Sequence, residues 1–198
     1  GRHLWLTAIL APRFLASAFA AGPALLILLC LLLRKVANFD VGKEAIQKLA
    51  TIVTYAALTN LFLYGLEFFT AFYSQIPGHM HPLQYLTSGL HGYSALVPWF
   101  WVSLLLGVGA ILLLLFPNIR KQENILAIAC IALFVSLWID KGICLILGGF
   151  VPTPLEHVTE YSVGSFEVMI TIGIYAIGAL ILTILYKTAI TVKQNAAK

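Results

Sequence analysis

The chain alternates long apolar stretches with short polar connections. Each of five apolar stretches exceeds the roughly 18 residues that mark a helix able to cross a bilayer. We therefore expect an all-α integral membrane protein, a bundle of about five transmembrane helices that forms one domain over residues 1–198. The expected spans are residues 6–33, 46–73, 95–116, 125–150 and 163–187.

Composition supports residence in a membrane. Hydrophobic residues make up 61% of the chain and charged residues 10%, against about 25% charged residues in a soluble domain. The net charge of +4 does not indicate nucleic-acid binding, because the basic residues form short clusters between apolar stretches. The three cysteines fall inside apolar stretches without metal-ligand spacing, so we interpret them as small buried side chains.

The basic residues of the connections predict an orientation. They flank the first connection, sit in the third and follow the last span, whereas residues 74–94 and 151–162 hold no Lys or Arg. The positive-inside rule then places the C-terminus in the cytoplasm and residues 74–94 and 151–162 outside. The protein is expected to be a multi-pass protein of the cytoplasmic (inner) membrane.

The two outer connections are rich in proline and histidine. Proline stiffens a connection, so we expect two stiff loops that could roof a site. Ordinary solvated connections are the alternative.

Five ionisable residues fall within the spans, where each costs about 2.5–3.5 kcal/mol at mid-depth and usually faces a cavity or a partner. At about 1.5 Å of rise per residue, all five lie in the outer half of their spans. They are Arg13, Glu67, Asp140, Lys141 and Glu167. This shared depth predicts a polar site near the outer face.

Helical spacing adds neighbours to this site. Asn60, Tyr64 and Glu67 follow an i, i+4, i+7 pattern, which places them on one face of the second span. Asp140 and Lys141 are adjacent and should point about 100° apart on a helix, so we expect them to have different partners.

Structural explanations remain open for several of these residues. Arg13 and Glu167 could snorkel to lipid headgroups. Asp140 could neutralise a buried cation from another span. Trp99 and Trp101 are simply explained as interfacial anchors, and the loop histidines as solvated side chains.

A polar pocket with apolar walls that open to lipid suits an amphipathic ligand such as a quinone. Its carbonyls need donors such as His, Tyr, Asn or Arg, and its protons need an acid or base with a path to water. A membrane haem b would need histidines at mid-span, where this chain has none, and the cysteine spacing does not fit an iron–sulfur cluster. We expect no metal site and no cofactor bound by this chain.

Several stretches resemble the NrfD/PsrC family of polysulfide reductase membrane subunits, and most strongly its DsrP-type members. The similar segments run in order over almost the whole chain. They are PRFLASAFAAGPALLIL (Pro12–Leu28), LYGLEFFTAFYS (Leu63–Ser74), YLTSGLHGYSALVPWFW (Tyr85–Trp101), WIDKGICLILGGFVPTPL (Trp138–Leu155) and EYSVGSFEVMITIGIYAIGAL (Glu160–Leu180).

The resemblance implies a membrane subunit without cofactors that exchanges electrons between menaquinone and a periplasmic iron–sulfur subunit, linked to dissimilatory sulfur or sulfite metabolism. Members have eight to ten helices, so we expect this chain to be the C-terminal half of such a protein. The implied partners are the periplasmic iron–sulfur subunit, a multihaem cytochrome c, a haem b membrane subunit and a cytoplasmic iron–sulfur subunit.

We assign site roles as hypotheses. Glu67 and Asp140 are candidates for proton handling. The candidates for holding a quinone headgroup are Arg13, Asn60, Tyr64, His91, Lys141 and Glu167. Two alternatives to the redox function are a proton or solute transporter that uses the same charges, and a purely structural anchor for peripheral subunits.

Overall fold

The computed structural model describes residues 2–37, 41–155, 157–161 and 163–196. It divides into two compact units, Gly1–Glu160 and Tyr161–Lys198, each described here by itself. The described residues are largely helical and contain no β-strand. Five helical segments are long and apolar enough to cross a membrane, which confirms the expected all-α membrane fold of about five spans.

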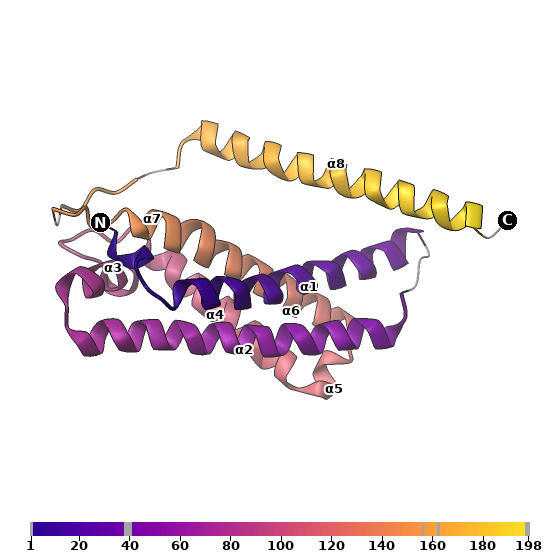
Figure 1. Cartoon of the computed structure of the whole chain (residues 1–198), viewed down its shortest axis with the longest axis horizontal. Helices are drawn as coiled ribbons and strands as arrows, with labels where there is room; N and C mark the ends of the chain where they lie inside the picture. The colour runs from indigo at the N-terminus through magenta and orange to yellow at the C-terminus, as the bar shows by residue number, and fades with distance from the viewer. Residues whose placement is uncertain (1, 38–40, 156, 162, 197–198) are drawn as a thin grey trace. The chain divides into compact units, whose positions relative to one another are not determined.

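The first unit runs from a short 3₁₀ turn through four membrane-length segments (Figure 1). The first helix begins at Leu10 rather than at residue 6, because residues 6–9 form a connection that follows the 3₁₀ turn. The elements are η1 (His3–Trp5), α1 (Leu10–Ala37), α2 (Lys43–Ser74), α3 (Pro77–Ser88), α4 (Val97–Leu115), α5 (Pro117–Arg120), α6 (Glu123–Trp138), η2 (Ile139–Leu145) and α7 (Ile146–Gly149).

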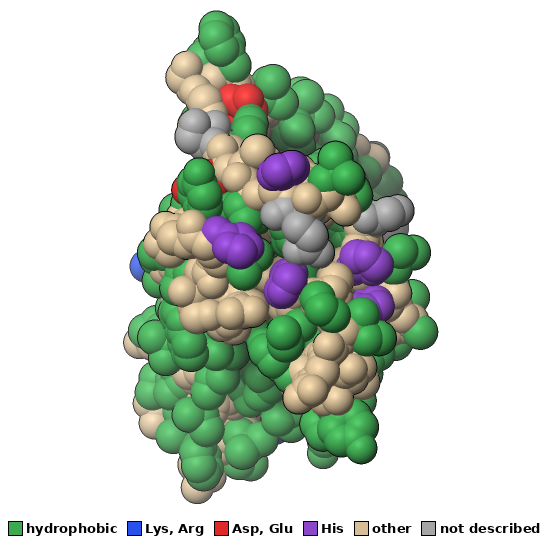
Figure 2. Space-filling model, turned by 90° about the vertical axis from the view of Figure 1, so that its left-hand side faces the viewer, with side chains coloured by type: hydrophobic (Ala, Val, Ile, Leu, Met, Phe, Trp, Pro, Cys, Tyr) green, Lys and Arg blue, Asp and Glu red, His purple; other side chains and the backbone are tan. Residues whose placement is uncertain are grey.

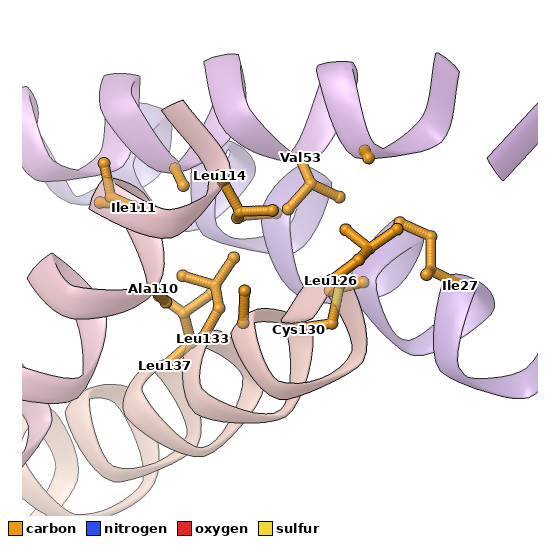
Figure 3. Close-up of a cluster of buried hydrophobic side chains, with 14 of the residues drawn as sticks. Ile27, Val53, Ala110, Ile111, Leu114, Leu126, Cys130, Leu133 and Leu137 are labelled. Carbon is orange, nitrogen blue, oxygen red and sulfur yellow. The ribbon is translucent and has the colours of Figure 1, made fainter. Parts of the chain in front are cut away.

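The apolar core lies where α1 packs along α2 and α6, and where α4 packs along α6. Ala20, Ala24 and Ala50 are completely buried between these helices, and such small side chains let helix backbones approach closely in a membrane. Figure 3 shows larger side chains from four helices meeting around Leu114, Leu126 and Leu133. This core fills the bundle on the side away from α3.

The expected loop at residues 74–94 is instead largely a helix, α3, so that part of the prediction was wrong. Pro77 occupies a first-turn position, where a helix needs no backbone N–H donor. Leu83, Tyr85 and Leu86 then bury one face of α3 in a second apolar cluster. Gly89, at a φ of 85°, ends the helix, and its N–H donates to the carbonyls of residues 84 and 85.

The fourth span is helical throughout but changes its winding. Between α6 and α7, Ile139–Leu145 forms a π-helix, which has a wider turn than an α-helix and is frequent at functional sites. This segment carries Asp140 and Lys141, so the ionisable part of the span departs from α-helical geometry.

The start of the chain is fastened to the end of the fourth span. The Trp5 indole N–H donates to the Leu145 carbonyl oxygen at 3.0 Å. The Trp5 ring also lies so close to Gly149 that a Cβ there would come within 2.3 Å of it. Arg2 donates to the Phe150 carbonyl oxygen at 2.9 Å. These contacts hold η1 in place beside α3.

Basic residues gather at the opposite end of the first unit. Arg34 at the end of α1 forms an ion pair with Glu123 at the start of α6. Arg120 donates to the Thr54 hydroxyl at 3.3 Å, and its carbonyl oxygen accepts from Gln47 at 3.2 Å. We call this the basic end, and we call the end that holds η1 and α3 the α3 end.

The second unit contains α8 (Ser165–Ala196), of which Ser165–Val192 is long and apolar enough for a span. At its start the Tyr161 hydroxyl donates to the Glu167 carboxylate. This hydrogen bond raises the pKa of Tyr161 above its ordinary value. The expectation that all 198 residues form one domain stays a prediction.

Candidate functional site

Arg13 is the centre of a buried ion cluster at the α3 end of the first unit. Its side chain is 2% exposed although it lies in the first turn of α1. One guanidinium nitrogen donates to Glu67 Oε2 on α2. The other donates to both carboxylate oxygens of Asp140, at 2.7 and 2.8 Å. Three membrane-length segments that are far apart in sequence therefore meet at one side chain.

Two further residues complete the cluster. The Arg13 guanidinium carbon lies 3.8 Å from the centre of the Tyr64 ring, a cation–π contact. Lys141 Nζ lies 3.2 Å from Asp140 Oδ2 and 4.9 Å from the centre of the Phe14 ring. In their ionised forms the two cations balance the two carboxylates, so the cluster has no net charge. Such balance is what burial of charges requires.

One structural alternative and one expectation about these residues were wrong. Arg13 does not snorkel to a headgroup, because it is buried and paired with two carboxylates. Asp140 and Lys141 were expected to have different partners, but they pair with each other, and Asp140 also pairs with Arg13. The 100° separation holds for an α-helix, whereas these residues lie in a π-helical segment with more residues per turn. Asp140 does neutralise a buried cation from another span, as one of the structural alternatives held.

An open cavity of about 390 Å³ lies beside Glu67. Its walls come from η1 and the residues after it, the end of α2, and α3, and they are mostly apolar. Glu67 Oε1 is buried and has no hydrogen-bond partner among the described residues, while Oε2 is held by Arg13. Glu67 therefore lines the cavity and keeps one buried carboxylate oxygen without a partner among the described residues.

A second, smaller cavity of about 30 Å³ lies on the other side of the cluster, among α2, α4 and the fourth span. Asn60, Tyr64 and Asp140 line it, together with Ser103 and Ser136. Asn60 Oδ1 is buried without a partner among the described residues. This volume is large enough for a water molecule, so Asn60 lies at the inner boundary of the polar region.

The structure does not bring every expected residue together. His91 sits in the tight turn between α3 and α4, exposed and at a φ of 51°, and it contacts none of the cluster residues. Glu167 belongs to the second unit, where its partner is Tyr161. The remaining residues predicted from the sequence meet in the cluster or line the cavities beside it.

Sequence reasoning missed His3 and His79, which line the large cavity together with Glu67. All five histidines of the chain lie in the first unit, and Figure 2 shows histidine side chains gathered over its α3 end. No helical periodicity links residues 3 and 79. The only available signal was that every histidine falls at the chain start or in an expected outer loop.

Comparison with known proteins places the chain in a family. Residues 1–154 match the family model described as polysulphide reductase, NrfD. This match covers more than half of the chain. The chain belongs to the NrfD family. The matched residues 1–154 contain α1 to α7 of the structure, and thus the whole ion cluster and both cavities. No curated protein matches the chain.

NrfD proteins are quinone-interacting membrane subunits of redox complexes, and they work with other redox subunits. The buried cluster of this NrfD chain therefore lies in a protein whose family handles quinones in a membrane. The match ends before α8, so the family assignment rests on the first unit.

Proposed function

We propose that this NrfD subunit exchanges electrons between menaquinone and an iron–sulfur subunit outside the cytoplasm, with the quinone headgroup in the cavity beside Glu67. The observation that carries the proposal is that Glu67, which lines a cavity of about 390 Å³, has one buried carboxylate oxygen without a hydrogen-bond partner among the described residues. This volume falls in the usual range for small-molecule pockets, which are mostly apolar with a few placed polar groups.

The geometry around Glu67 suits a quinol hydroxyl. Oε1 accepts a hydrogen bond from the hydroxyl while Oε2 stays bound to Arg13. Oxidation of the quinol releases two electrons to the iron–sulfur partner and two protons, the first of which passes to Glu67; reduction reverses these steps. Asp140 keeps Arg13 paired throughout, and this limits the electrostatic cost when Glu67 gains a proton.

The rim of the cavity gives a reason for a lipid-soluble substrate. Leu6 and Ile76 line the cavity and are at least half exposed. They lie just beyond the ends of α1 and α2, and we place the apolar tail of the quinone along them as it leaves the cavity toward lipid.

The basic end predicts the orientation of this arrangement. Lys and Arg are enriched in cytoplasmic connections, and Arg34, Arg120 and Lys121 belong to the end opposite to α3. We therefore assign the α3 end to the outer face of the cytoplasmic membrane. By the same rule, the lysines at and after the end of the last span assign the C-terminus to the cytoplasm. The iron–sulfur partner would dock at the α3 end, near the quinone.

The resemblance to DsrP-type subunits extends the proposal to sulfur metabolism. The complex would then also contain a multihaem cytochrome c, a haem b membrane subunit and a cytoplasmic iron–sulfur subunit, and it would link menaquinone to sulfite reduction. Purification of the complex under mild conditions followed by haem and iron analysis tests this assignment.

A transporter or channel is less well supported. The apolar core fills the bundle between Asn60 and the basic end, with Val53, Leu114 and Leu133 at its centre (Figure 3). The ion cluster thus lies near one end of the bundle. Ion flux through vesicles that contain this subunit alone would favour the transporter.

Replacement of Glu67 by Gln in the intact complex tests the proposed site. The amide keeps the shape but cannot take up a proton, so quinol-linked electron transfer should fall by about 100-fold or more. Glu44→Gln is the matched control on the same helix, since Glu44 is exposed and pairs with Lys48 at the basic end. Normal turnover of the Glu67 variant would remove this residue from the mechanism.

A further inference from the structure

Two histidines from different elements meet beside the large cavity. His3 belongs to η1 and His79 to α3, and their ring centres are 5.0 Å apart in an edge-to-face arrangement. Both line the same cavity as Glu67. His3 is exposed and His79 half-buried, so the pair lies between the cavity and the surface of the α3 end.

The fold makes room for this pair. A Cβ at residue 78 would lie 2.8 Å from the His3 ring, so only glycine lets the ring pack against the first turn of α3. Trp5 fixes η1 from the other side through its hydrogen bond to Leu145. The position of His3 is therefore set by packing on both sides.

The same cavity is also lined by hydroxyl-bearing residues. Thr7, Thr70 and Ser74 contribute hydroxyls to the lining. The Thr70 hydroxyl donates to the Glu67 carbonyl oxygen and that of Ser74 to the Ala71 carbonyl oxygen, so both retain acceptor capacity. A cavity of this size also has room for water beside a ligand.

We propose that His79 and His3 form the proton outlet of the quinone cavity. This inference rests on the proposed function. For each quinol oxidised, two electrons go to the iron–sulfur partner. The protons released at the headgroup and at Glu67 pass across the cavity to His79, then to His3 and to water; quinone reduction draws protons inward by the same route.

The charges around the pair suit this role. Arg2 is adjacent to His3, and its guanidinium is held by the Phe150 carbonyl oxygen. Glu67 lines the same cavity as the pair. His81 lies on α3 two residues after His79. The short helix α7, which packs against η1, carries no titratable side chain. Imidazole both accepts and releases protons near neutral pH, and is therefore suited to a relay.

Quinol oxidation by the intact complex, measured against pH, tests the outlet. His79→Gln should lower the maximal rate by about 100-fold and leave the KM for quinol unchanged, because the step lost is proton release and not binding. Added imidazole should restore much of the rate. His157→Gln, an exposed histidine at the same end, is the matched control and should behave as the unaltered complex.

Inhibition by zinc ions is a second test of the outlet. Zn²⁺ binds imidazole nitrogen, so it should slow the unaltered complex and the His157→Gln control. It should have much less effect on His3→Gln, which alters an exposed side chain and leaves the backbone in place. Equal zinc sensitivity of all three forms would overturn the outlet.

The outcomes separate this inference from the proposed function. Loss of turnover in Glu67→Gln with normal turnover and zinc sensitivity in both histidine variants would overturn the outlet alone. Normal turnover in Glu67→Gln would overturn the proposed site itself. A His79→Gln variant that raises only the KM would assign His79 to binding and contradict its role in proton transfer.

Discussion

Helix α1 carries an arginine near each end, and the two ends differ in what surrounds them. Arg13 is 2% exposed and joins α2 and the π-helical segment through two carboxylates beside a cavity. The Arg34 side chain is 26% exposed and forms an ion pair with Glu123. The same residue type on the same helix thus belongs to a buried polar site at one end and to a partly exposed ion pair at the other.

The comparison shows why burial matters more than pairing. Removal of one member of a buried ion pair leaves a charge that neither water nor a partner compensates, whereas partly exposed pairs contribute little because water and salt screen them. The charged pattern in the sequence is similar at both ends, and only the packing around each arginine distinguishes them.

The largest effect is expected from Arg13→Gln. It leaves Lys141 as the one cation of the cluster for two buried carboxylates, which should lower the free energy of unfolding by about 3–5 kcal/mol. Arg34→Gln should lower it by less than about 1 kcal/mol. Thermal unfolding of both variants in detergent checks the difference, and equal losses would show that the two arginines are energetically alike.

A smaller effect is expected beside the cluster, where α4 crosses the fourth span. Ser103 and Ser136 exchange hydrogen bonds between hydroxyl and carbonyl groups at 2.9 and 2.7 Å. A Cβ at Gly107 would lie 2.7 Å from Ser136 Oγ, whereas a Cβ at Gly109 meets open space.

Gly107→Ala should therefore be less stable than Gly109→Ala by about 1–3 kcal/mol, since the added methyl displaces Ser136 from its partner. The two variants share the same gain in helix propensity, so their difference in unfolding free energy isolates the clash. Indistinguishable stabilities would mean that α4 shifts to accept the methyl group.

The smallest effect is expected from the hydrogen bond between Tyr85 and Glu160 at the α3 end. The Tyr85 hydroxyl donates to Glu160 at 3.1 Å, and the same carboxylate oxygen accepts from the Ala95 N–H at 2.8 Å. Burial raises the pKa of Tyr85 well above its ordinary value of about 10, and the hydrogen bond to the Glu160 carboxylate raises it further.

A raised pKa means that the contribution of this hydrogen bond to stability is fully present below about pH 10 and is lost as the pH rises through the folded-state pKa.

Tyr85→Phe should destabilise the protein by about 1 kcal/mol and speed proteolytic cleavage of the segment that precedes Glu160. Thr87→Ala, which removes a hydroxyl bonded only to carbonyls within α3, is the control. Equal cleavage rates of Tyr85→Phe and Thr87→Ala at pH 8 would contradict a role for the tyrosine hydroxyl.

Parts of this arrangement follow from local sequence. The run of apolar residues predicts each span, and the spacing of Asn60, Tyr64 and Glu67 predicts their common face, because helix geometry relates neighbours a few residues apart. A shared depth for Arg13, Glu67 and Asp140 follows from counting residues from the helix ends. These predictions need no knowledge of how one span packs against another.

Other parts depend on contacts between distant segments. Lys141 pairs with Asp140 within a π-helical segment, and α3 forms where a loop was expected because its apolar face has a cluster to pack against. The pairing of His3 with His79 requires η1 to be held against α3 and α7. None of these positions can be read from local periodicity.

The sequence by itself determined that this chain lies in a membrane, that it holds about five spans and at which depth its charges occur, since these depend on hydrophobicity and on the rise of a helix. Only the tertiary structure decided which charges meet, which carboxylate oxygen stays unengaged and where the cavity lies. The physical reason is that pairing and burial depend on the angle and packing between helices, which residues far apart in the chain set together.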